Sequence, residues 1–184
     1  MRNEHKSNKA TVILSFKNPV KEPDTKPPEK ILIRTPNWLG DLMMSTAFVQ
    51  KVLQSFPNAR VDLIVKKGFE TLPLPCRGRI LPFDKKSISA FRFGKGLRGY
   101  SYDRIYVLPP SFSSALMAFA AKIPERIGYQ GELRGLLLNK SKRYLKQPRS
   151  QHLVTEYTQL LDGLEQEELV YPYLSIDNDW IEQH

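Results

Sequence analysis

The spacing of hydrophobic residues changes along the chain, and each change predicts a different element of secondary structure. Residues 31–35 form a short apolar run of the kind found in buried strands. A turn marked by proline, asparagine and glycine follows over residues 36–40. From Leu42 onwards the hydrophobic residues fall at helical spacing, as Val49, Val52, Leu53 and Phe56 show. A strand, a tight loop and a helix in this order predict the opening unit of an α/β domain.

The same alternation continues through the rest of the chain. Further strands are predicted at residues 61–65, 79–83, 103–108 and 126–129. Helical segments are predicted at residues 69–72, 87–98, 111–123 and 153–164. A basic loop punctuated by glycine is expected between the fifth strand and the last helix. Because strands and helices alternate about five times, the predicted fold is a Rossmann-like parallel sheet flanked by helices.

Three regions of different composition divide the chain. Residues 1–29 are expected to form an extended N-terminal segment, because prolines stand among lysines and glutamates there. Residues 30–165 hold the predicted Rossmann-like domain. Residues 166–184 are acidic and are expected to begin a linker. Residues 12–16 have the composition of an edge strand, but disorder or loose packing is favoured for this stretch.

The net charge of the chain indicates which kinds of partner it can bind. The 184 residues carry a net charge of +9, with a pI near 9.6. This indicates an anionic partner: a nucleic acid, a membrane surface, or a phosphorylated or carboxylated substrate. A single cysteine excludes an internal disulfide, and three scattered histidines give no metal site. No apolar run approaches the roughly 18 residues of a membrane span, and the start lacks the cleavage site of a signal peptide. A cytoplasmic protein is therefore expected.

Basic residues are concentrated near the fifth predicted strand. Between residues 122 and 149, eight lysines and arginines stand against two glutamates, a local excess of six. Such a run is usually a solvated face. Here it follows a strand, so part of it is expected to line the crevice at the carboxyl ends of the strands, where open parallel sheets bind ligands.

Asp41 stands at the same end of the predicted sheet, beyond the first strand. An aspartate at a helix start caps the helix and meets the positive end of its dipole, but in this crevice it could instead act as a general base. The sequence leaves both interpretations open. Trp38, on the same loop, is equally compatible with a packing anchor and with an apolar wall against a sugar ring. A carboxylate that faces a basic wall suits the deprotonation of a hydroxyl on an anionic acceptor.

Residues 94–99, with the sequence Gly-Lys-Gly-Leu-Arg-Gly, have the glycine spacing of the dinucleotide-binding fingerprint. They follow a predicted helical stretch and precede a predicted strand, whereas the fingerprint needs a strand before it and a helix after it. We therefore expect no nucleotide at this segment.

Three stretches of the sequence resemble one enzyme family. They are residues 31–45 (ILIRTPNWLGDLMMS), 102–116 (YDRIYVLPPSFSSAL) and 123–134 (IPERIGYQGELR). In this order they are similar to the opening of the ADP-heptose:lipopolysaccharide heptosyltransferases of glycosyltransferase family 9, the type II enzymes in particular. The likeness covers about the same residues, 30–165, as the predicted domain.

The resemblance implies a GT-B glycosyltransferase of two Rossmann-like domains, of which residues 30–165 would be the N-terminal, acceptor-binding one. It implies an inverting reaction without a metal ion or cofactor, in which Asp41 is the general base that deprotonates the acceptor heptose. Arg126 and Arg134 would hold acceptor phosphate or Kdo carboxylate. The residues matched to acceptor binding are Asn37, Trp38, Gly40, Ser111, Ser114, Arg126, Gly131 and Arg134.

The implied acceptor is the lipopolysaccharide inner core, Kdo-lipid A that already carries heptose, and the implied donor is ADP-heptose. Such enzymes work at the cytoplasmic face of the inner membrane, so a peripheral membrane association at most is expected. The donor would bind a C-terminal domain that we expect to be missing, because the sequence ends where the linker of the family begins, and the chain alone is then expected to be inactive. Pro110 and Ser113 stand where relatives usually have asparagine and lysine, so one acceptor contact of the family is expected to be lost.

Two other functions remain as alternatives. The first is a truncated, non-catalytic module that recognises an anionic glycolipid or docks with a separately encoded partner half. The second is a nucleic-acid-binding protein. It is the weakest interpretation, because the basic residues lack interleaved aromatic residues for base stacking. We therefore expect no nucleic-acid partner.

Overall fold

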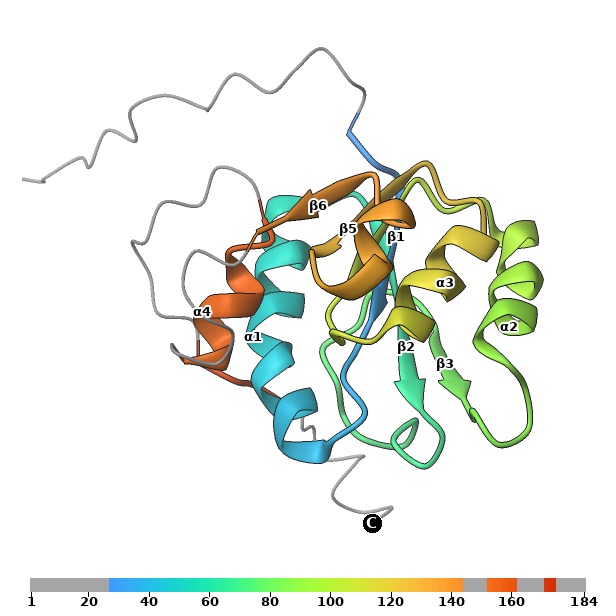
Figure 1. The fold of residues 1–184 in the computed structure, drawn as a ribbon. Coiled ribbons are helices and arrows are strands. Elements are labelled where there is room, and N and C mark those ends of the chain that lie inside the picture. Colours follow the sequence, from blue (N-terminus) through green and yellow to red (C-terminus); the bar gives the residue numbers. More distant parts are fainter. Residues whose placement is uncertain (1–26, 144–151, 162–170, 175–184) are drawn as a thin grey trace, which may run out of the picture.

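A computed structural model describes residues 27–143, 152–161 and 171–174, and a parallel sheet forms the centre of the domain (Figure 1). Its neighbouring strands are all parallel, in the spatial order β3-β2-β1-β4-β5-β6. The predicted Rossmann-like sheet is confirmed. The strands are β1 (Lys30–Arg34), β2 (Arg60–Lys66), β3 (Ile80–Phe83), β4 (Arg104–Val107), β5 (Glu125–Tyr129) and β6 (Lys140–Lys142).

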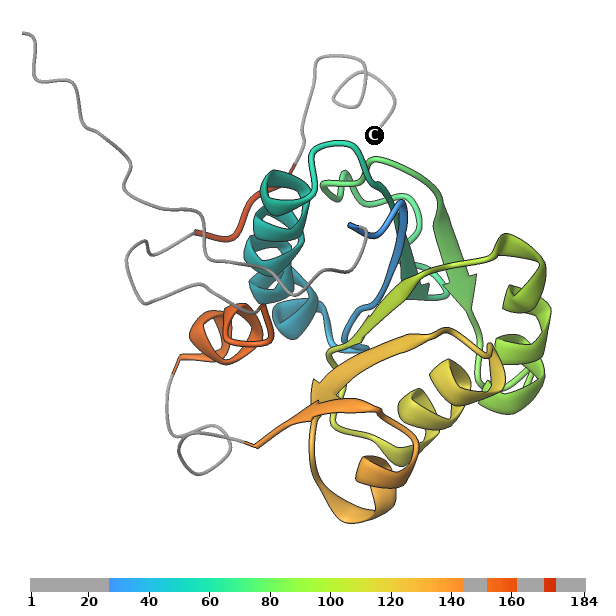
Figure 2. The ribbon, with the colours of Figure 1, turned by 90° about the horizontal axis from the view of Figure 1, so that it is seen from above.

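Helices cover both faces of the sheet. In the described part of the chain, α1 and α4 lie on one face and α2 and α3 on the other (Figure 2). None of the described helices combines the length and the apolar character that crossing a membrane requires. The α-helices are α1 (Leu39–Ser55), α2 (Ala90–Gly96), α3 (Phe112–Ala120) and α4 (Leu153–Thr158), and the 3-10 helices are η1 (Leu97–Tyr100) and η2 (Glu132–Leu136).

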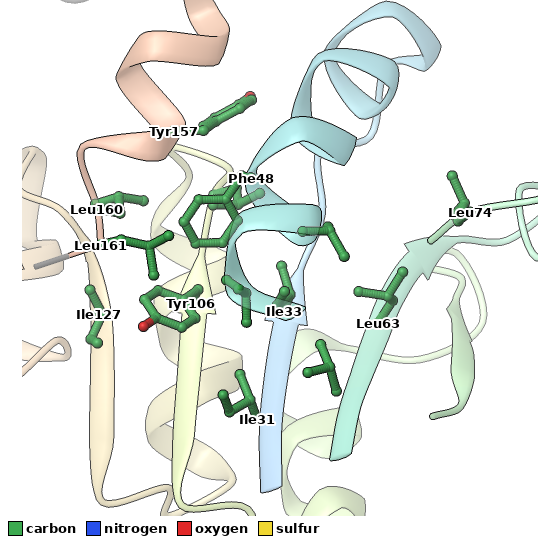
Figure 3. Close-up of a cluster of buried hydrophobic side chains, with 14 of the residues drawn as sticks. Ile31, Ile33, Phe48, Leu63, Leu74, Tyr106, Ile127, Tyr157, Leu160 and Leu161 are labelled. Atoms are coloured by element: carbon green, nitrogen blue, oxygen red, sulfur yellow. The ribbon is translucent and has the colours of Figure 1, made fainter. Parts of the chain in front are cut away.

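Each face of the sheet has its own hydrophobic core. Side chains alternate along a strand, so Ile31 and Ile33 of β1 belong to the core under α1, whereas Leu32 belongs to the core under α2 and α3. On the α1 side, the ring of Phe48 meets the ring of Tyr106 edge-on, with 5.1 Å between their centroids (Figure 3). Because both faces are covered, β1 is a continuous apolar run, as expected of a strand inside a parallel sheet.

Residues 171–174 return to α1. The backbone N–H of Tyr173 donates to Thr46 Oγ1 (2.8 Å), and Leu174 packs against the core on the α1 side of the sheet. This short stretch therefore lies against the domain.

The helix predicted at residues 69–72 is wrong, because this stretch forms turns. Gly68 adopts a left-handed conformation, with φ +94°, and Leu72 precedes Pro73, which disfavours the helical conformation. The N–H of Leu74 donates to the carbonyl of Leu72 (2.7 Å) and closes a tight turn instead.

The glycine-punctuated loop predicted after β5 is wrong in its first part. It contains η2 and the edge strand β6, in which Ser141 pairs with Gly128 of β5. Two of the three residues of β6 are lysines, a composition typical of protected sheet edges that gives no hydrophobic alternation to signal a strand. The edge strand considered at residues 12–16 and the predictions for residues 1–26, 144–151, 162–170 and 175–184 fall outside the part of the chain that the structure describes.

A buried carboxylate holds the amino-terminal edge of the sheet together. Asp62 of β2 is 1% exposed and accepts hydrogen bonds from Tyr102 Oη (2.6 Å), the Arg79 N–H (2.7 Å) and Arg60 Nε (2.9 Å). Burial alone would raise the pKa of Asp62, but these hydrogen bonds together lower it. Burial, reinforced by Asp62, raises the pKa of the Tyr102 hydroxyl. The carboxylate thus ties β2 to the residues that precede β3 and β4.

The substitution Asp62→Asn is expected to lower the free energy of unfolding by about 2–3 kcal/mol at pH 7, because three hydrogen bonds lose their charged acceptor. A carboxylate whose pKa is lowered by folding stabilises the fold above its unfolded pKa of about 3.9, and this contribution is lost as the pH falls through its folded value. The stabilities of the two proteins should therefore converge below about pH 4. Urea titrations across this range would check this, with Glu70→Gln as the control carboxylate. A gap that stays constant down to pH 2 would contradict the prediction.

Candidate functional site

The carboxyl ends of β1, β2 and β3 surround a pocket of about 630 Å³. All strands of a parallel sheet end at the same edge, and the crevice outside this edge is the usual ligand site. In Figure 1 this edge is the lower one, where the arrows of β2 and β3 end. The lining residues are Arg34, Asn37, Trp38, Lys66, Lys67, Phe83, Asp84, Lys85, Lys86, Ile88, Ser89, Ala90, Ser113, Ser114 and Met117.

Arg34, the last residue of β1, lines this pocket although its side chain is only 1% exposed. Its Nη1 donates to the carbonyl of Thr35 and its Nη2 to Oδ1 of Asn37. The guanidinium lies over the ring of Phe83, 5.5 Å from the centroid. Among the described residues, its Nε has no hydrogen-bond partner. Burial lowers the pKa of Arg34 to about 10, so the pocket wall contains a buried positive charge with an unused donor.

Four lysines make the pocket strongly cationic. Lys66 and Lys67 come from the end of β2, and Lys85 and Lys86 follow β3. The lining contains one carboxylate, Asp84, which already accepts hydrogen bonds from the hydroxyl of Ser87 and the N–H of Lys86. With Arg34, five cations therefore stand against one carboxylate, and the pocket is suited to a multiply charged anion.

Asp41 lies in the first turn of α1, next to the part of the loop that lines the pocket. The N-cap residue of α1 is Trp38, and no side chain caps this helix, so Asp41 is not a cap, but in the first turn it does meet the positive end of the helix dipole. The carboxylate is half-buried, and the described residues give it no hydrogen bond or ion pair. A Cβ on Gly40 would meet no heavy atom within 4 Å, so there is open space beside Asp41. A carboxylate with this freedom can accept a proton from a ligand.

Trp38 and the serines at the start of α3 complete the wall. Trp38 is 76% exposed, which excludes a packing anchor and leaves it as an apolar wall. Ser111 caps α3, because its Oγ accepts from the N–H of Ser114 and lies 2.8 Å from the Ser114 Oγ. Ser113 and Ser114, in the first turn, line the pocket. The positive end of the α3 dipole thus adds to the cationic character of the site.

Comparisons with known proteins identify the family. Residues 90–180 match the model of glycosyltransferase family 9 (heptosyltransferase). Over 121 residues the chain is 36% identical to lipopolysaccharide heptosyltransferase 2 of Escherichia coli, an alignment of 60% of this chain and 34% of that protein. The solved structure of E. coli ADP-heptose lps heptosyltransferase II matches with a TM-score of 0.69 and 33% identity, over 82% of this chain and 47% of that one. The chain carries a glycosyltransferase family 9 domain.

The family 9 domain spans between a third and a half of the length of these relatives. A family 9 glycosyltransferase from Veillonella parvula matches it with a TM-score of 0.71 and 16% identity, over 84% of this chain and 47% of that one, a likeness of fold alone. The resemblance predicted from the sequence and the Rossmann-like half of a GT-B fold are thereby confirmed. The family match begins at residue 90, beyond Asp41, so the role of Asp41 stays a prediction.

Two arginines, Arg126 and Arg134, were predicted to hold the acceptor. In the structure both donate hydrogen bonds to backbone carbonyls of the domain instead. Arg134 of η2 is 1% exposed and donates to the carbonyls of Tyr129 (2.8 Å) and Pro109 (3.0 Å), which ties together the ends of β4 and β5. Arg126 donates to two backbone carbonyls, at 2.6 and 2.7 Å, one of them just before β5. Neither arginine lines the pocket, and nor does Gly131, the exposed residue before η2.

The four lysines of the pocket were not predicted as site residues. A signal for them was available, because a Lys-Lys pair follows closely on each of two predicted strands. The pairs come together only because β2 and β3 are neighbours in the sheet. Within the described ranges, no group of three or more histidine, cysteine, aspartate or glutamate side chains could hold a metal ion.

Proposed function

We propose that this chain is the acceptor-side domain of an inverting glycosyltransferase that transfers heptose from ADP-heptose to heptose-bearing Kdo-lipid A of the lipopolysaccharide inner core. The observation that carries this proposal is a half-buried Asp41 that has no partner among the described residues and follows by three residues Trp38, which lines a pocket with five cations. The family supports the class of reaction, and the names of the relatives support the class of donor and acceptor.

In the proposed reaction Asp41 is the general base. Its carboxylate accepts the proton of the acceptor heptose hydroxyl while that oxygen attacks the anomeric carbon of the donor. A glycosidic C–O bond forms, the bond between the anomeric carbon and the β-phosphate oxygen breaks, and ADP leaves with the bonding electrons. Attack opposite the leaving group inverts the anomeric centre, and the scheme needs neither a metal ion nor a cofactor.

The cationic pocket holds the acceptor in this scheme. Kdo carboxylates and core phosphates form strong, charge-assisted hydrogen bonds with arginine and lysine. The four lysines offer such donors, and the buried Arg34 adds a positive charge to the wall. Asn37, whose amide oxygen already accepts from Arg34, keeps its NH2 group for a sugar hydroxyl. Trp38 offers an exposed apolar face to a sugar ring.

The donor is proposed to bind a second domain of GT-B type that faces this edge, within the same polypeptide or on a partner chain. The domain described here would then bind the acceptor without transferring heptose by itself. The proposed compartment is the cytoplasm, with at most a peripheral contact to the inner membrane.

Isothermal titration with heptose-bearing Kdo-lipid A, and separately with ADP, tests this proposal. We expect saturable binding of the acceptor and no binding of ADP. The double variant Lys67→Ala/Lys86→Ala should bind the acceptor about tenfold more weakly at low salt, since two exposed charge contacts of about 0.7 kcal/mol each amount to about 1.4 kcal/mol. The matched control Arg92→Ala/Lys95→Ala removes the same charge from exposed positions of α2 outside the pocket lining and should bind like the parent.

Three other outcomes would redirect the proposal. An equal loss of affinity in both double variants would mean that the acceptor is attracted by net charge alone. Binding of ADP without the acceptor would mean that the chain is the donor side. Acceptor binding without any transfer, even with a donor domain supplied, would favour the alternative of a non-catalytic module that binds anionic glycolipid or docks with a partner half.

A further inference from the structure

A second pocket, of about 450 Å³, lies at the amino-terminal edge of the sheet, opposite the proposed acceptor pocket. Its cations stand where strands begin: Lys30 starts β1, Arg60 starts β2, and Arg79 directly precedes β3. Gly99 and Tyr100, at the end of η1, form another wall. Ligands of parallel sheets usually bind at the other edge, so a cavity lined by three cations at this edge indicates a separate site.

Contacts within the protein hold these three cations in place. Arg60 donates through Nε to Asp62 (2.9 Å). The guanidinium of Arg79 lies over the ring of Tyr100, 5.2 Å from its centroid. The ammonium group of Lys30 donates to the carbonyl of Tyr100 (3.2 Å). The positive groups are therefore oriented toward a common cavity before any ligand arrives, which reduces the entropy lost on binding.

After these contacts, N–H donors of the two arginines and part of the positive charge of the lining remain available for a ligand. Among the described residues, the Nη groups of Arg60 and the side-chain N–H groups of Arg79 have no hydrogen-bond acceptor. The carboxylate in the lining, Asp62, is 1% exposed and also accepts from the hydroxyl of Tyr102 and the backbone N–H of Arg79. Within the lining, three cations therefore stand against this one carboxylate.

We propose that this pocket binds a phosphate monoester. Such a group carries about −1.5 to −2 charges at neutral pH and three acceptor oxygens, which suit the excess of cations in the lining and the donors of Lys30, Arg60 and Arg79. Guanidinium groups engage two phosphate oxygens at once, so two arginines favour phosphate over a monovalent anion. The volume lies within the usual range for small-molecule pockets, roughly 300–1,000 Å³, and accommodates the phosphate with a small organic group.

The glycine-rich segment of residues 94–99 acquires a role in this site. Gly99 lines the pocket, and a Cβ on it would meet no heavy atom within 4 Å. The wall at this point is therefore bare backbone that faces open space, and a phosphate can approach it closely. No residue is shared with the acceptor pocket, so the inference does not depend on the proposed transfer reaction.

A titration of the ¹⁵N-labelled chain with methyl phosphate tests the proposal, read at the backbone amides of Arg79 and Gly99. We expect these amides to shift saturably. The variant Arg79→Gln keeps the backbone N–H that holds Asp62 and should bind at least about tenfold more weakly, since the charge-assisted hydrogen bonds of the guanidinium to the phosphate are lost. Lys30→Gln should give a second, independent loss. The control Arg92→Gln removes the same charge from an exposed position of α2 and should leave the affinity unchanged.

Two outcomes would overturn the proposal: binding at Gly99 that is as tight in Arg79→Gln as in the parent, and shifts confined to the acceptor pocket, for example at Ser113. Sedimentation with phosphatidic acid vesicles, against phosphatidylcholine vesicles, separates the two supporting cases. Vesicle binding that depends on Arg79 would identify a lipid phosphate as the source. Binding of methyl phosphate without vesicle binding would identify a soluble phosphate ester.

Discussion

Asparagine in place of Asp41 should lower the rate of heptose transfer by about 10²- to 10⁴-fold, while the affinity for the acceptor stays within about twofold of the parent. Asparagine has nearly the same size but cannot accept the hydroxyl proton, so only the bond-forming step loses a group that it needs. The rate would be measured in a fusion of this chain to the carboxyl-terminal half of E. coli heptosyltransferase 2. Single-turnover kinetics and acceptor titration would separate catalysis from binding.

A matched control for this experiment is Asp103→Asn. It makes the same chemical change at the opposite edge of the sheet, where Asp103 accepts hydrogen bonds from the backbone N–H groups of Glu29 and Lys30. The control should transfer heptose at the parent rate. If Asp41→Asn did so too, Asp41 would have no place in the mechanism. If it lost acceptor affinity in proportion to the rate, Asp41 would be a binding residue.

The substitution Arg134→Ala should lower the free energy of unfolding by about 3–5 kcal/mol, since two buried carbonyl groups lose their partner at roughly 1–3 kcal/mol each and a cavity remains. These carbonyls belong to Pro109 and Tyr129, at the ends of β4 and β5. Stabilities of folded domains are commonly about 5–15 kcal/mol, so the effect is large. Urea unfolding followed by circular dichroism measures it.

The exposed Arg143 supplies the comparison for Arg134. Arg143→Ala removes the same charge from the surface and should change the stability by less than about 0.5 kcal/mol. A stable Arg134→Ala protein that no longer binds the acceptor would reverse the assignment, because it would give Arg134 the ligand contact that the family resemblance implies. A protein that is destabilised but still binds the acceptor when folded would support the structural role.

The sheet could be predicted because the local pattern and the tertiary environment agree. Ile31, Leu32 and Ile33 form an unbroken apolar run, and burial on both faces of a parallel sheet requires that pattern. The helical spacing after Leu42 likewise corresponds to the face of α1 that packs on the sheet, with Phe48 and Val52 fully buried. In both places the spacing of apolar residues in the sequence equals the spacing of the buried positions in the structure.

The pocket could not be predicted in the same way, because it depends on which strands are neighbours. Lys66 and Lys86 are far apart along the chain and meet only through the order β3-β2-β1. The sequence also does not show whether a basic side chain will face a ligand or donate to the backbone of the protein itself. Arg126 belongs to a basic stretch, yet its guanidinium donates to backbone carbonyls, whereas Arg34 follows an apolar run and lines the pocket.

The hydrogen bond between Tyr173 and Thr46 has a mechanical consequence. Thr46 follows Asp41 by five residues on the same helix, about 7.5 Å along its axis at roughly 1.5 Å per residue. The hydrogen bond at Tyr173 therefore attaches residues 171–174 to the helix whose first turn carries Asp41.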